Sequence, residues 1–88
     1  MDIKTLKVYI AVYDARSFSR PASSLSTVQS NVSWHIRKLE KLIGQPLFRR
    51  GYREIEPTET GEKFYSYAKR AVASFEEVRT NFLPSRAA

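Results

Sequence analysis

Two short amphipathic segments, separated by two polar residues, constrain this chain more than any other feature. Residues 17–25 read Ser-Phe-Ser-Arg-Pro-Ala-Ser-Ser-Leu, and residues 28–40 read Val-Gln-Ser-Asn-Val-Ser-Trp-His-Ile-Arg-Lys-Leu-Glu. In the second segment Val32, Ile36 and Leu39 recur at helical spacing, while the opposite side carries small polar, amide, aromatic and basic residues. Such a helix can anchor one face in a core and place the other in the major groove of DNA. The pattern predicts two short helices joined by a tight turn.

Positive charge is concentrated in the same part of the chain. The 88 residues carry a formal net charge of +6. Residues 1–53 hold ten Lys or Arg against three acids, a net of +7, whereas residues 54–88 hold five against six, a net of −1. This distribution favours a polyanionic partner, because a protein that neutralises phosphates releases their counterions. A merely solvated basic surface is the alternative interpretation.

The composition argues against several other classes of protein. With 88 residues and 42% hydrophobic content, the chain can build a small core but not a deep catalytic cleft as well. There is no Cys and only one His, and Ser33 and His35 are two residues apart on a helix, so they cannot form a nucleophile–base pair. No apolar run approaches about 18 residues, and the N-terminus lacks a signal-peptide pattern. We therefore expect a cytoplasmic, non-enzymatic protein without cofactor, metal or membrane contact.

Apolar periodicity and capping signals predict two helices at the start of the chain. The first is expected over residues 3–15, directly after an acidic capping residue. The second is expected over about residues 18–25, with Ser17 or Ser19 as its cap. Pro21 fits there if the helix begins near Ser19, and otherwise costs one backbone hydrogen bond. The core-facing residues of this helix are expected to be Phe18, Ala22 and Leu25.

The third helix is expected over about residues 28–43. Ser26 and Thr27 form the turn and cap before it, and Gly44 stops it, because glycine is favoured just past a helix end. The single His35 is expected to be a surface residue or a phosphate donor.

A small two-stranded wing is predicted over about residues 47–57. Residues 47–48 form its first strand, and residues 54–56 return as its second. Pro57 is expected to end that strand, since proline cannot donate to a ladder. The basic residues around the wing, which can follow phosphates or enter a narrow minor groove, are Arg49, Arg50 and Arg53.

A long helix is predicted over residues 59–83, with Thr58 as its cap. Its apolar positions alternate by four and three residues, which is the period of a helix–helix seam. At 1.5 Å per residue it would reach about 37 Å, longer than so small a domain can cover. We therefore expect it to pair with another chain, and packing on its own domain is the alternative. The seam residues are Phe64, Ala68, Ala71, Phe75, Val78 and Phe82.

A helix-turn-helix reads bases through the N-terminal part of its second helix. Once the apolar stripe is buried, the residues left facing outward are Gln29, Ser30, Ser33, Trp34 and Arg37. Gln29 can pair with N6 and N7 of adenine, although a solvated first-turn residue is the alternative. Ser30 and Ser33 are short enough to let the helix approach the bases. The residues that share the helix face of Trp34 are polar, which indicates an interface with DNA or with a protein partner.

Together these features resemble the N-terminal DNA-binding domain of the LysR-type transcriptional regulators over about residues 1–83. The matching positions are Leu6, Tyr9, Val12, Ser17, Phe18, Ala22, Leu25, Gln29, Ser33, Ile36, Leu39, Glu40, Gly44, Leu47, Phe48, Arg50, Thr58 and Gly61. The fold expected is mainly α: a winged helix-turn-helix over residues 1–58, with the helix-turn-helix at about 18–37. A linker helix for dimerisation follows over residues 59–83, and a polar tail over 84–88.

The resemblance implies sequence-specific binding to double-stranded promoter DNA, with the recognition helix in the major groove and the wing on the backbone or minor groove. It also implies a homodimer that pairs through antiparallel linker helices on an interrupted palindrome and is nucleoid-associated when bound. A tetramer is expected only with a C-terminal effector domain, which this sequence does not contain, and no small-molecule ligand is expected here. The alternative is a protein-interaction or decoy module whose linker helix captures a related regulator.

Carried over residue by residue, the resemblance also implies a contact set. Its members are Gln29, Ser30, Ser33, Trp34, Arg50 and Arg53, with Thr27, Asn31, Arg37 and Lys38 as further candidates. Five positions depart from the family pattern: Val28, Ser30 and Trp34 stand where relatives commonly carry Ser, Pro and Arg, and Arg16 and Pro21 stand where they carry Gly and Ala. The helix cap is therefore expected to shift to Thr27, and the sequence preference of the family does not transfer.

Overall fold

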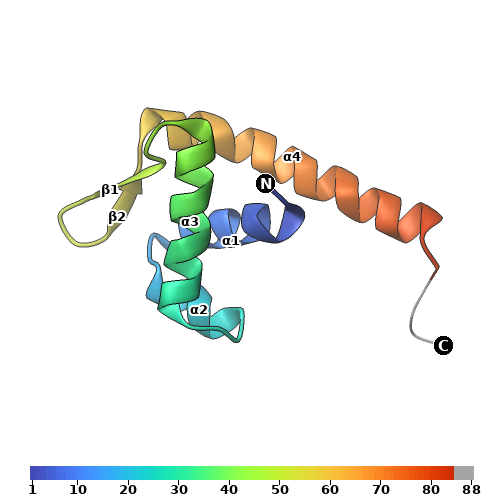
Figure 1. Ribbon diagram of the computed structural model, residues 1–88, viewed down its shortest axis with the longest axis horizontal. Helices are drawn as coiled ribbons and strands as arrows, with labels where there is room; N and C mark the ends of the chain where they lie inside the picture. Colours follow the sequence, from blue (N-terminus) through green and yellow to red (C-terminus); the bar gives the residue numbers. More distant parts are fainter. Residues whose placement is uncertain (85–88) are drawn as a thin grey trace.

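Over residues 1–84, which the computed structural model describes, the chain forms four helices and one two-stranded sheet (Figure 1). The elements are α1 (Ile3–Ala15), α2 (Ser19–Ser24), α3 (Gln29–Ile43), β1 (Phe48–Arg50), β2 (Ile55–Pro57) and α4 (Glu59–Phe82). This architecture confirms the mainly α, winged helix-turn-helix fold with a long final helix. Most of the tail predicted over 84–88 lies outside the described residues.

Short polar side chains and one glycine set the helix boundaries. The Asp2 carboxylate accepts a hydrogen bond from the Thr5 backbone N–H at 2.9 Å, which begins α1 and lowers the pKa of that carboxyl. The Thr58 hydroxyl accepts one from the Gly61 N–H at 3.1 Å and begins α4. Gly44 ends α3 in the left-handed region, with φ of 82°.

α2 begins at Ser19, so Pro21 lies within the first turn, where a proline is tolerated. The N-cap position is Phe18, which makes no side-chain capping bond; the Ser17 hydroxyl, one residue earlier, accepts hydrogen bonds at 3.2 Å from the backbone N–H groups of Ser19 and Arg20. The expectation that Leu25 faces the core is wrong. Leu25 is 41% exposed, because the helix has ended one residue earlier and the chain has already turned.

The expected cap of α3 is also wrong. The N-cap position is Val28, whose extended backbone carbonyl accepts from the N–H groups of Asn31 and Val32, and no side chain caps the helix. The Thr27 hydroxyl lies one residue too early and instead accepts a hydrogen bond from the Asn31 amide at 3.1 Å. α3 thus begins with backbone N–H groups that no side chain caps.

The wing is shifted by one residue from its expected position. The antiparallel register pairs Phe48 with Pro57, Arg49 with Glu56 and Arg50 with Ile55. The first strand therefore begins after Leu47, and Pro57 lies inside the ladder instead of ending it. Proline is accommodated there because a two-stranded sheet has only edge strands, so its nitrogen needs no partner. Thr58 then closes the wing, since its N–H donates to the Leu47 carbonyl at 3.0 Å.

The core lies where α1 meets α3, β1 and the first half of α4. Its centre is Tyr9, which is fully buried and whose ring lies 5.4 Å from that of Phe48 and 5.2 Å from that of Phe64. The Tyr9 hydroxyl donates to the Gly61 carbonyl at 2.5 Å, and burial raises its pKa. The other buried apolar residues are Leu6, Val8, Val12, Ala22, Val32, Ile36, Leu39, Leu47 and Ala68.

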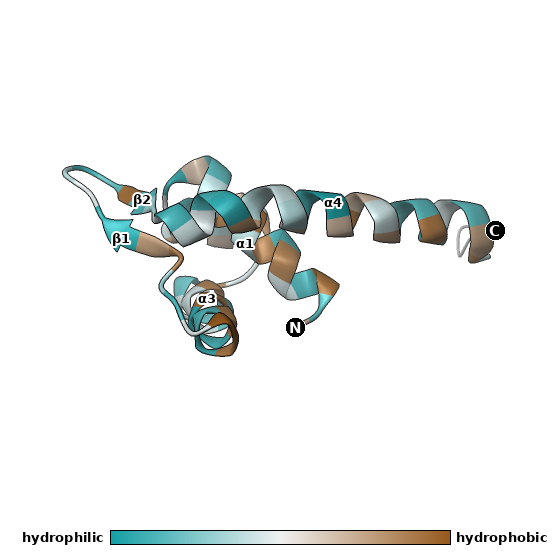
Figure 2. Ribbon diagram, turned by 90° about the horizontal axis from the view of Figure 1, so that it is seen from above, coloured by the Kyte–Doolittle hydropathy of each residue, from teal (hydrophilic) through white to brown (hydrophobic). Residues whose placement is uncertain are grey.

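α4 packs on α1 along its first half and then leaves the body of the domain (Figure 2). Within the packed half, the Tyr65 ring stacks on Tyr13 with centroids 3.8 Å apart. The Tyr65 hydroxyl donates to the Asp14 carboxylate at 2.6 Å, which raises the pKa of Tyr65 to about 12. Further along, Glu76 pairs with Lys7 of α1 at 2.8 Å. No helix within residues 1–84 is long and apolar enough to cross a membrane.

Gly61→Ala should destabilise the domain, although Gly→Ala in an exposed helix usually stabilises by about 0.5–1 kcal/mol. A Cβ at Gly61 would collide with the Leu47 backbone carbonyl, which cannot move without disturbing the wing. We expect the free energy of unfolding in urea to fall by about 1–3 kcal/mol. Ser66→Ala on the exposed side of α4 is the control and should stay within about 0.5 kcal/mol. A more stable Gly61→Ala protein would contradict the packing described.

Glu76→Gln should change how stability depends on pH. Hydrogen bonds from Lys7 and Arg79 lower the pKa of Glu76 below its ordinary value of 4.5. The stabilisation is therefore fully present above 4.5 and is lost as the pH falls through the lower folded pKa. Urea unfolding from neutral pH downward should show lower stability of Glu76→Gln at neutral pH and a shallower loss in acid. Equal acid slopes for the two proteins would contradict this assignment; Asp2 titrates in both and cancels.

Candidate nucleic-acid interface

The outward face of α3 carries the side chains that the sequence singled out for base reading. Val32, Ile36 and Leu39 are buried on the opposite side of the helix, which fixes its rotation. The five side chains expected to face outward all reach the surface, with Ser33 half-buried and Gln29, Ser30, Trp34 and Arg37 exposed. The N-terminal half of α3 therefore presents a largely polar, small-residue surface with one large aromatic ring.

A cleft of about 540 Å³ separates this helix from the wing and from the turn between α1 and α2. Gln29 and Ser33 line it from α3. The charged side chains around it are Arg16, Arg37, Arg49, Arg50, Arg53, Glu40 and Glu54. Five guanidinium groups against two carboxylates give the cleft a strongly positive potential, as required of a surface that meets phosphates.

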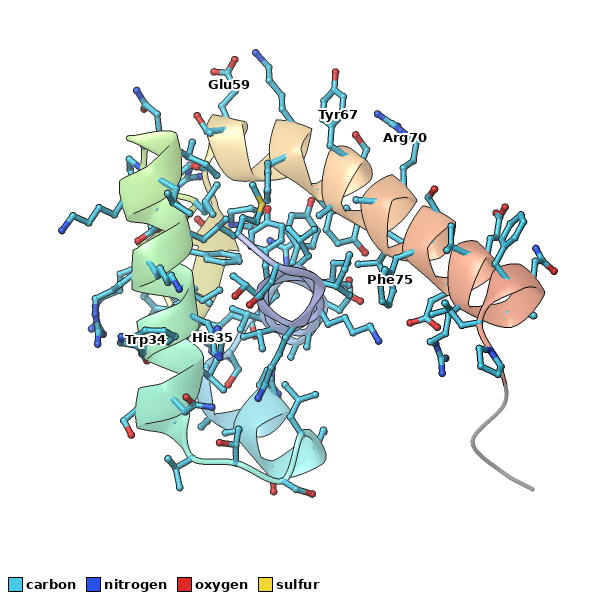
Figure 3. The ribbon with its side chains drawn as sticks, turned by 45° about the vertical axis from the view of Figure 1, so that its right-hand side comes forward. Trp34, His35, Glu59, Tyr67, Arg70 and Phe75 are labelled. Carbon is cyan, nitrogen blue, oxygen red and sulfur yellow. The ribbon has the colours of Figure 1, made fainter. Side chains whose placement is uncertain are left out.

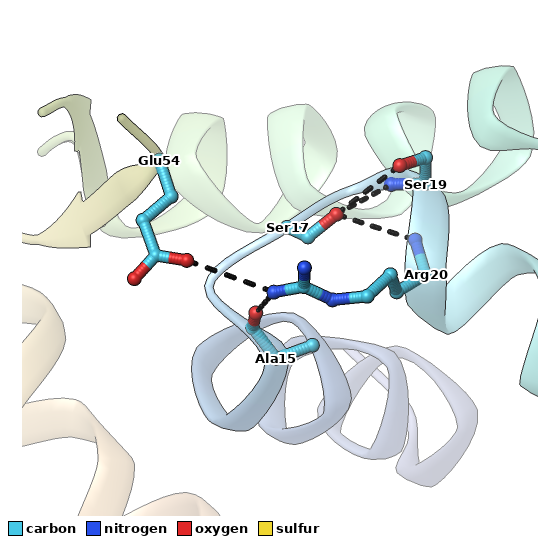
Figure 4. Close-up of polar contacts among 5 residues, drawn as sticks. All are labelled: Ala15, Ser17, Ser19, Arg20 and Glu54. Atoms are coloured by element: carbon cyan, nitrogen blue, oxygen red, sulfur yellow. Dashed lines mark hydrogen bonds and ion pairs between the residues drawn. The ribbon is translucent and has the colours of Figure 1, made fainter. Parts of the chain in front are cut away.

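Both carboxylates at the cleft are engaged in holding the structure together. Glu40 accepts a hydrogen bond from the Leu47 backbone N–H at 2.7 Å, which fixes the loop between α3 and the wing. Glu54 pairs with Arg20 of α2 at 3.6 Å, and the same guanidinium donates to the Ala15 carbonyl (Figure 4). These contacts tie the wing to the helix-turn-helix, so the two parts present their basic groups as one surface.

The three arginines of the wing differ in whether they form an ion pair with a carboxylate. Arg49 pairs with Glu56 at 3.4 Å and donates to the Pro57 carbonyl at 3.3 Å. Among the residues that the structure describes, Arg50 and Arg53 form no ion pair, and the Arg53 guanidinium lies 5.8 Å from the exposed Tyr52 ring. Arg50 and Arg53 are thus the wing groups best placed to neutralise phosphates.

The remaining candidates lie at the margins of this surface. Thr27 and Asn31 are half-buried and hydrogen-bond to each other at the N-terminus of α3. Lys38 is exposed, and its ammonium lies 4.9 Å from the centroid of the Trp34 ring. Neither Thr27, Asn31 nor Lys38 lines the cleft, so any contact they make with a partner would be along the sides of α3.

The expectation that His35 is a surface residue is wrong. His35 is 7% exposed, and its Nδ1 lies 3.0 Å from the hydroxyl of the buried Thr5 of α1. The spacing contains the missed signal: His35 follows Val32 by three residues and precedes Leu39 by four, which places it in the apolar stripe. Its role is to join α3 to α1 beneath the outward face.

Sequence reasoning also missed the contribution of the turn between α1 and α2. Arg16 and Ser17 line the cleft, and Arg20 makes the contact to the wing. No periodicity could have found these positions, because they reach the cleft only through the packing of α2 against α3. Arg16 ends α1 in the left-handed region with φ of 54°, where glycine is the residue with least strain.

The residues predicted for a helix–helix seam fall into two groups. Ala68 is buried and Phe64 is half-buried against Tyr9, so both contact their own domain. The remaining seam residues, Ala71, Phe75, Val78 and Phe82, are exposed within residues 1–84. Figure 3 shows Phe75 on the inner side of α4, whereas Tyr67 and Arg70 point away from the domain.

Within residues 1–84, no group of three or more His, Asp or Glu is placed to hold a metal ion.

The sequence matches a known family over most of its length. The family, described as bacterial regulatory helix-turn-helix proteins of the lysR family, matches residues 3–62. The HTH-type transcriptional regulator BudR of Raoultella terrigena is 45% identical over 65 residues, which are 74% of this chain and 22% of that protein. BudR of Klebsiella aerogenes is 41% identical over 73 residues, which are 83% and 51% of the two chains. The chain thus spans between about a fifth and a half of these relatives.

Solved structures show the same fold at the level of the whole chain. The DNA-binding domain of BenM in complex with catB site 1 DNA superposes with a TM-score of 0.86 at 30% identity, covering 91% of this chain and 90% of that chain. The complex of the CbnR DNA-binding domain with DNA gives a TM-score of 0.79 at 30% identity, with coverage of 91% and 94%.

Proposed function

This chain belongs to the LysR family of bacterial regulatory helix-turn-helix proteins as an N-terminal DNA-binding domain, and from that premise we propose that it binds promoter DNA sequence-specifically within a transcription regulator. One observation carries the proposal: Gln29, Ser33 and Arg37 of α3 border the same guanidinium-rich cleft as the wing arginines Arg50 and Arg53. The BenM and CbnR domains, which share the fold, are both seen in complexes with DNA.

We assign base reading to the N-terminal half of α3 in the major groove. Gln29 carries an acceptor and donors for an adenine edge, and the short Ser30 and Ser33 let the helix backbone approach. Arg37 borders the cleft a turn further along, and with Lys38 it serves the phosphates. Contacts of these two cationic side chains with phosphates contribute affinity without reading sequence.

The wing is assigned to the DNA backbone or to an adjacent minor groove. Arg50 and Arg53 lie on an exposed strand and turn and, within residues 1–84, lack the carboxylate partner that Arg49 has. Phe48 is buried against Tyr9 and Glu54 pairs with Arg20, so the base of the wing has a defined position relative to α3. A fixed offset allows phosphate contacts to set the register in which the bases are read.

We further propose that the domain works as a homodimer through the exposed half of α4. Phe75, Val78 and Phe82 form an apolar stripe that leaves the body of the domain, and Phe82 is 79% exposed. An antiparallel pair of such helices would bury both stripes and place two α3 helices on an interrupted palindrome, about 34 Å apart or a multiple of it. A tetramer and an effector-binding domain belong to the longer proteins of the family.

The same stripe supports a second candidate function, a protein-interaction or decoy module. In that case α4 would capture the corresponding helix of a related regulator, and the winged domain would serve as a scaffold. The basic cleft distinguishes the two candidates, because a scaffold has no need of five arginines around one cleft.

The DNA assignment is tested by selecting duplexes from a random pool and measuring affinity at several salt concentrations. Gln29→Ala should lose about 1–3 kcal/mol of discrimination between selected and random duplexes. Arg53→Ala should weaken both duplexes alike and reduce the salt slope by about one. Arg70→Ala removes an arginine on the far side of α4 and should change neither value. Unchanged discrimination by Gln29→Ala would refute its role as a reading residue.

The dimer assignment is tested by light scattering without DNA. Phe75→Asp places a charge in the stripe and should halve the molar mass while the helical content by circular dichroism is retained. Ala73→Asp, on the opposite side of α4, is the matched control and should leave the mass unchanged. A wild-type monomer would contradict the paired helix, and a stable heterocomplex without DNA affinity would favour the interaction module.

A further inference from the structure

Trp34 is the one large apolar side chain on the reading half of α3 that the core does not use. It is 49% exposed, and its neighbours on that face are Ser30, Arg37 and Lys38. Small and basic neighbours suit a surface that approaches phosphates and base edges, not a protein core. We propose that Trp34 is a specificity-determining residue that recognises thymine in the major groove through its 5-methyl group. This inference rests on the proposed function.

The Trp34 indole contacts His35, which is itself hydrogen-bonded to the core residue Thr5. The buried Thr5 of α1 hydrogen-bonds to His35 at 3.0 Å, and the His35 ring meets the Trp34 ring edge-on, with centroids 5.0 Å apart at 78°. Figure 3 shows His35 on the side of α3 that faces α1, with Trp34 on the outer side. Because His35 cannot move freely, the indole keeps an orientation before DNA arrives, which lowers the entropic cost of the contact.

The ring also lies in the second turn of α3, within the half of the helix to which base reading is assigned. A long side chain on a helix leans towards the N-terminus, so Trp34 covers the turn that contains Ser30. The short Ser30 side chain leaves room for a ring on that turn. Lys38, one turn later, holds its ammonium 4.9 Å from the ring centroid, where it can stabilise the ring and face a phosphate at once.

The chemistry of the indole selects one base over the other three. Tryptophan offers an apolar surface and one N–H donor but no acceptor. In the major groove thymine presents a methyl group beside the O4 acceptor, which matches both properties. Cytosine offers a donor and no methyl, so it satisfies neither, while guanine and adenine offer acceptors without the methyl. A half-site read by Trp34 should therefore contain a thymine whose methyl group contributes to affinity.

The test uses a duplex that the wild-type chain selects from a random pool. Each thymine is replaced singly by deoxyuridine, which removes only the methyl group. At one thymine or more per half-site, wild-type affinity should fall by about fourfold, the value for one buried methyl group. Trp34→Ala should bind thymine and uracil duplexes equally at those positions, and Trp34→Phe should keep part of the difference. Replacing the same thymine by 5-methylcytosine should cost less affinity than replacing it by cytosine.

Leu42→Ala is the matched control, because Leu42 is an exposed apolar residue of α3 far from the reading end; it should discriminate uracil as the wild type does. Wild-type binding to the selected duplex that is indifferent to every uracil would overturn the role of Trp34 and leave the proposed function intact. The role of Trp34 would also be overturned if Trp34→Ala lost the same affinity for thymine and uracil duplexes and therefore still preferred thymine. A chain that binds no duplex at all would overturn both proposals.

Discussion

The buried ring of Tyr9 is the interaction on which the rest of the structure depends. It packs against Phe48 at the start of the wing and Phe64 on α4, and its hydroxyl donates to the Gly61 carbonyl. One side chain of α1 therefore contacts both β1 and α4. A tyrosine can do this because its body is apolar and its far end is polar, so it fills the core and still satisfies a buried carbonyl.

The candidate interface is assembled from three segments, and the buried Leu47 and Phe48 already anchor the wing in the core. Glu40 holds the backbone of Leu47, and Glu54 meets Arg20 across the gap between wing and α2. Ion pairs this exposed contribute little to stability. The hydrogen bond from the Leu47 N–H to Glu40 and the burial of Phe48 therefore do more than the exposed Arg20–Glu54 pair to place the arginine-bearing wing relative to α3.

Much of the fold was predictable because its signals are local. Apolar spacing gave α1 and the buried stripe of α3, and Gly44 and Thr58 marked helix ends through their own backbone chemistry. The failures were of another kind. Histidine is a polar residue type, so the sequence predicts an exposed His35, although its spacing from Val32 and Leu39 puts it in the buried stripe. Leu25 is predicted to face the core because the expected helix includes it, whereas α2 ends at Ser24.

The candidate interface was predictable on α3 and largely invisible elsewhere. The outward positions of a helix follow from the burial of its opposite face, so Gln29, Ser30 and Trp34 could be identified from spacing alone. Arg16 and Arg20 reach the cleft through tertiary packing, which leaves no periodic trace in a sequence. The apolar stripe of α4 changes from buried to exposed after Ala68. The sequence could not predict this point, because the residues before and after it follow the same spacing.

The single residue between β2 and α4 has a mechanical consequence. Thr58 bonds back to Leu47 through its N–H and to Pro46 through its hydroxyl, at 3.0 and 2.7 Å, so the junction contains no hinge. α4 is therefore a rigid extension whose first half is held by the wing and the core. If α4 tilts, the outward face of α3 turns with it. In a pair of such domains, the angle at which the two α4 helices cross would therefore set the distance between the two α3 faces.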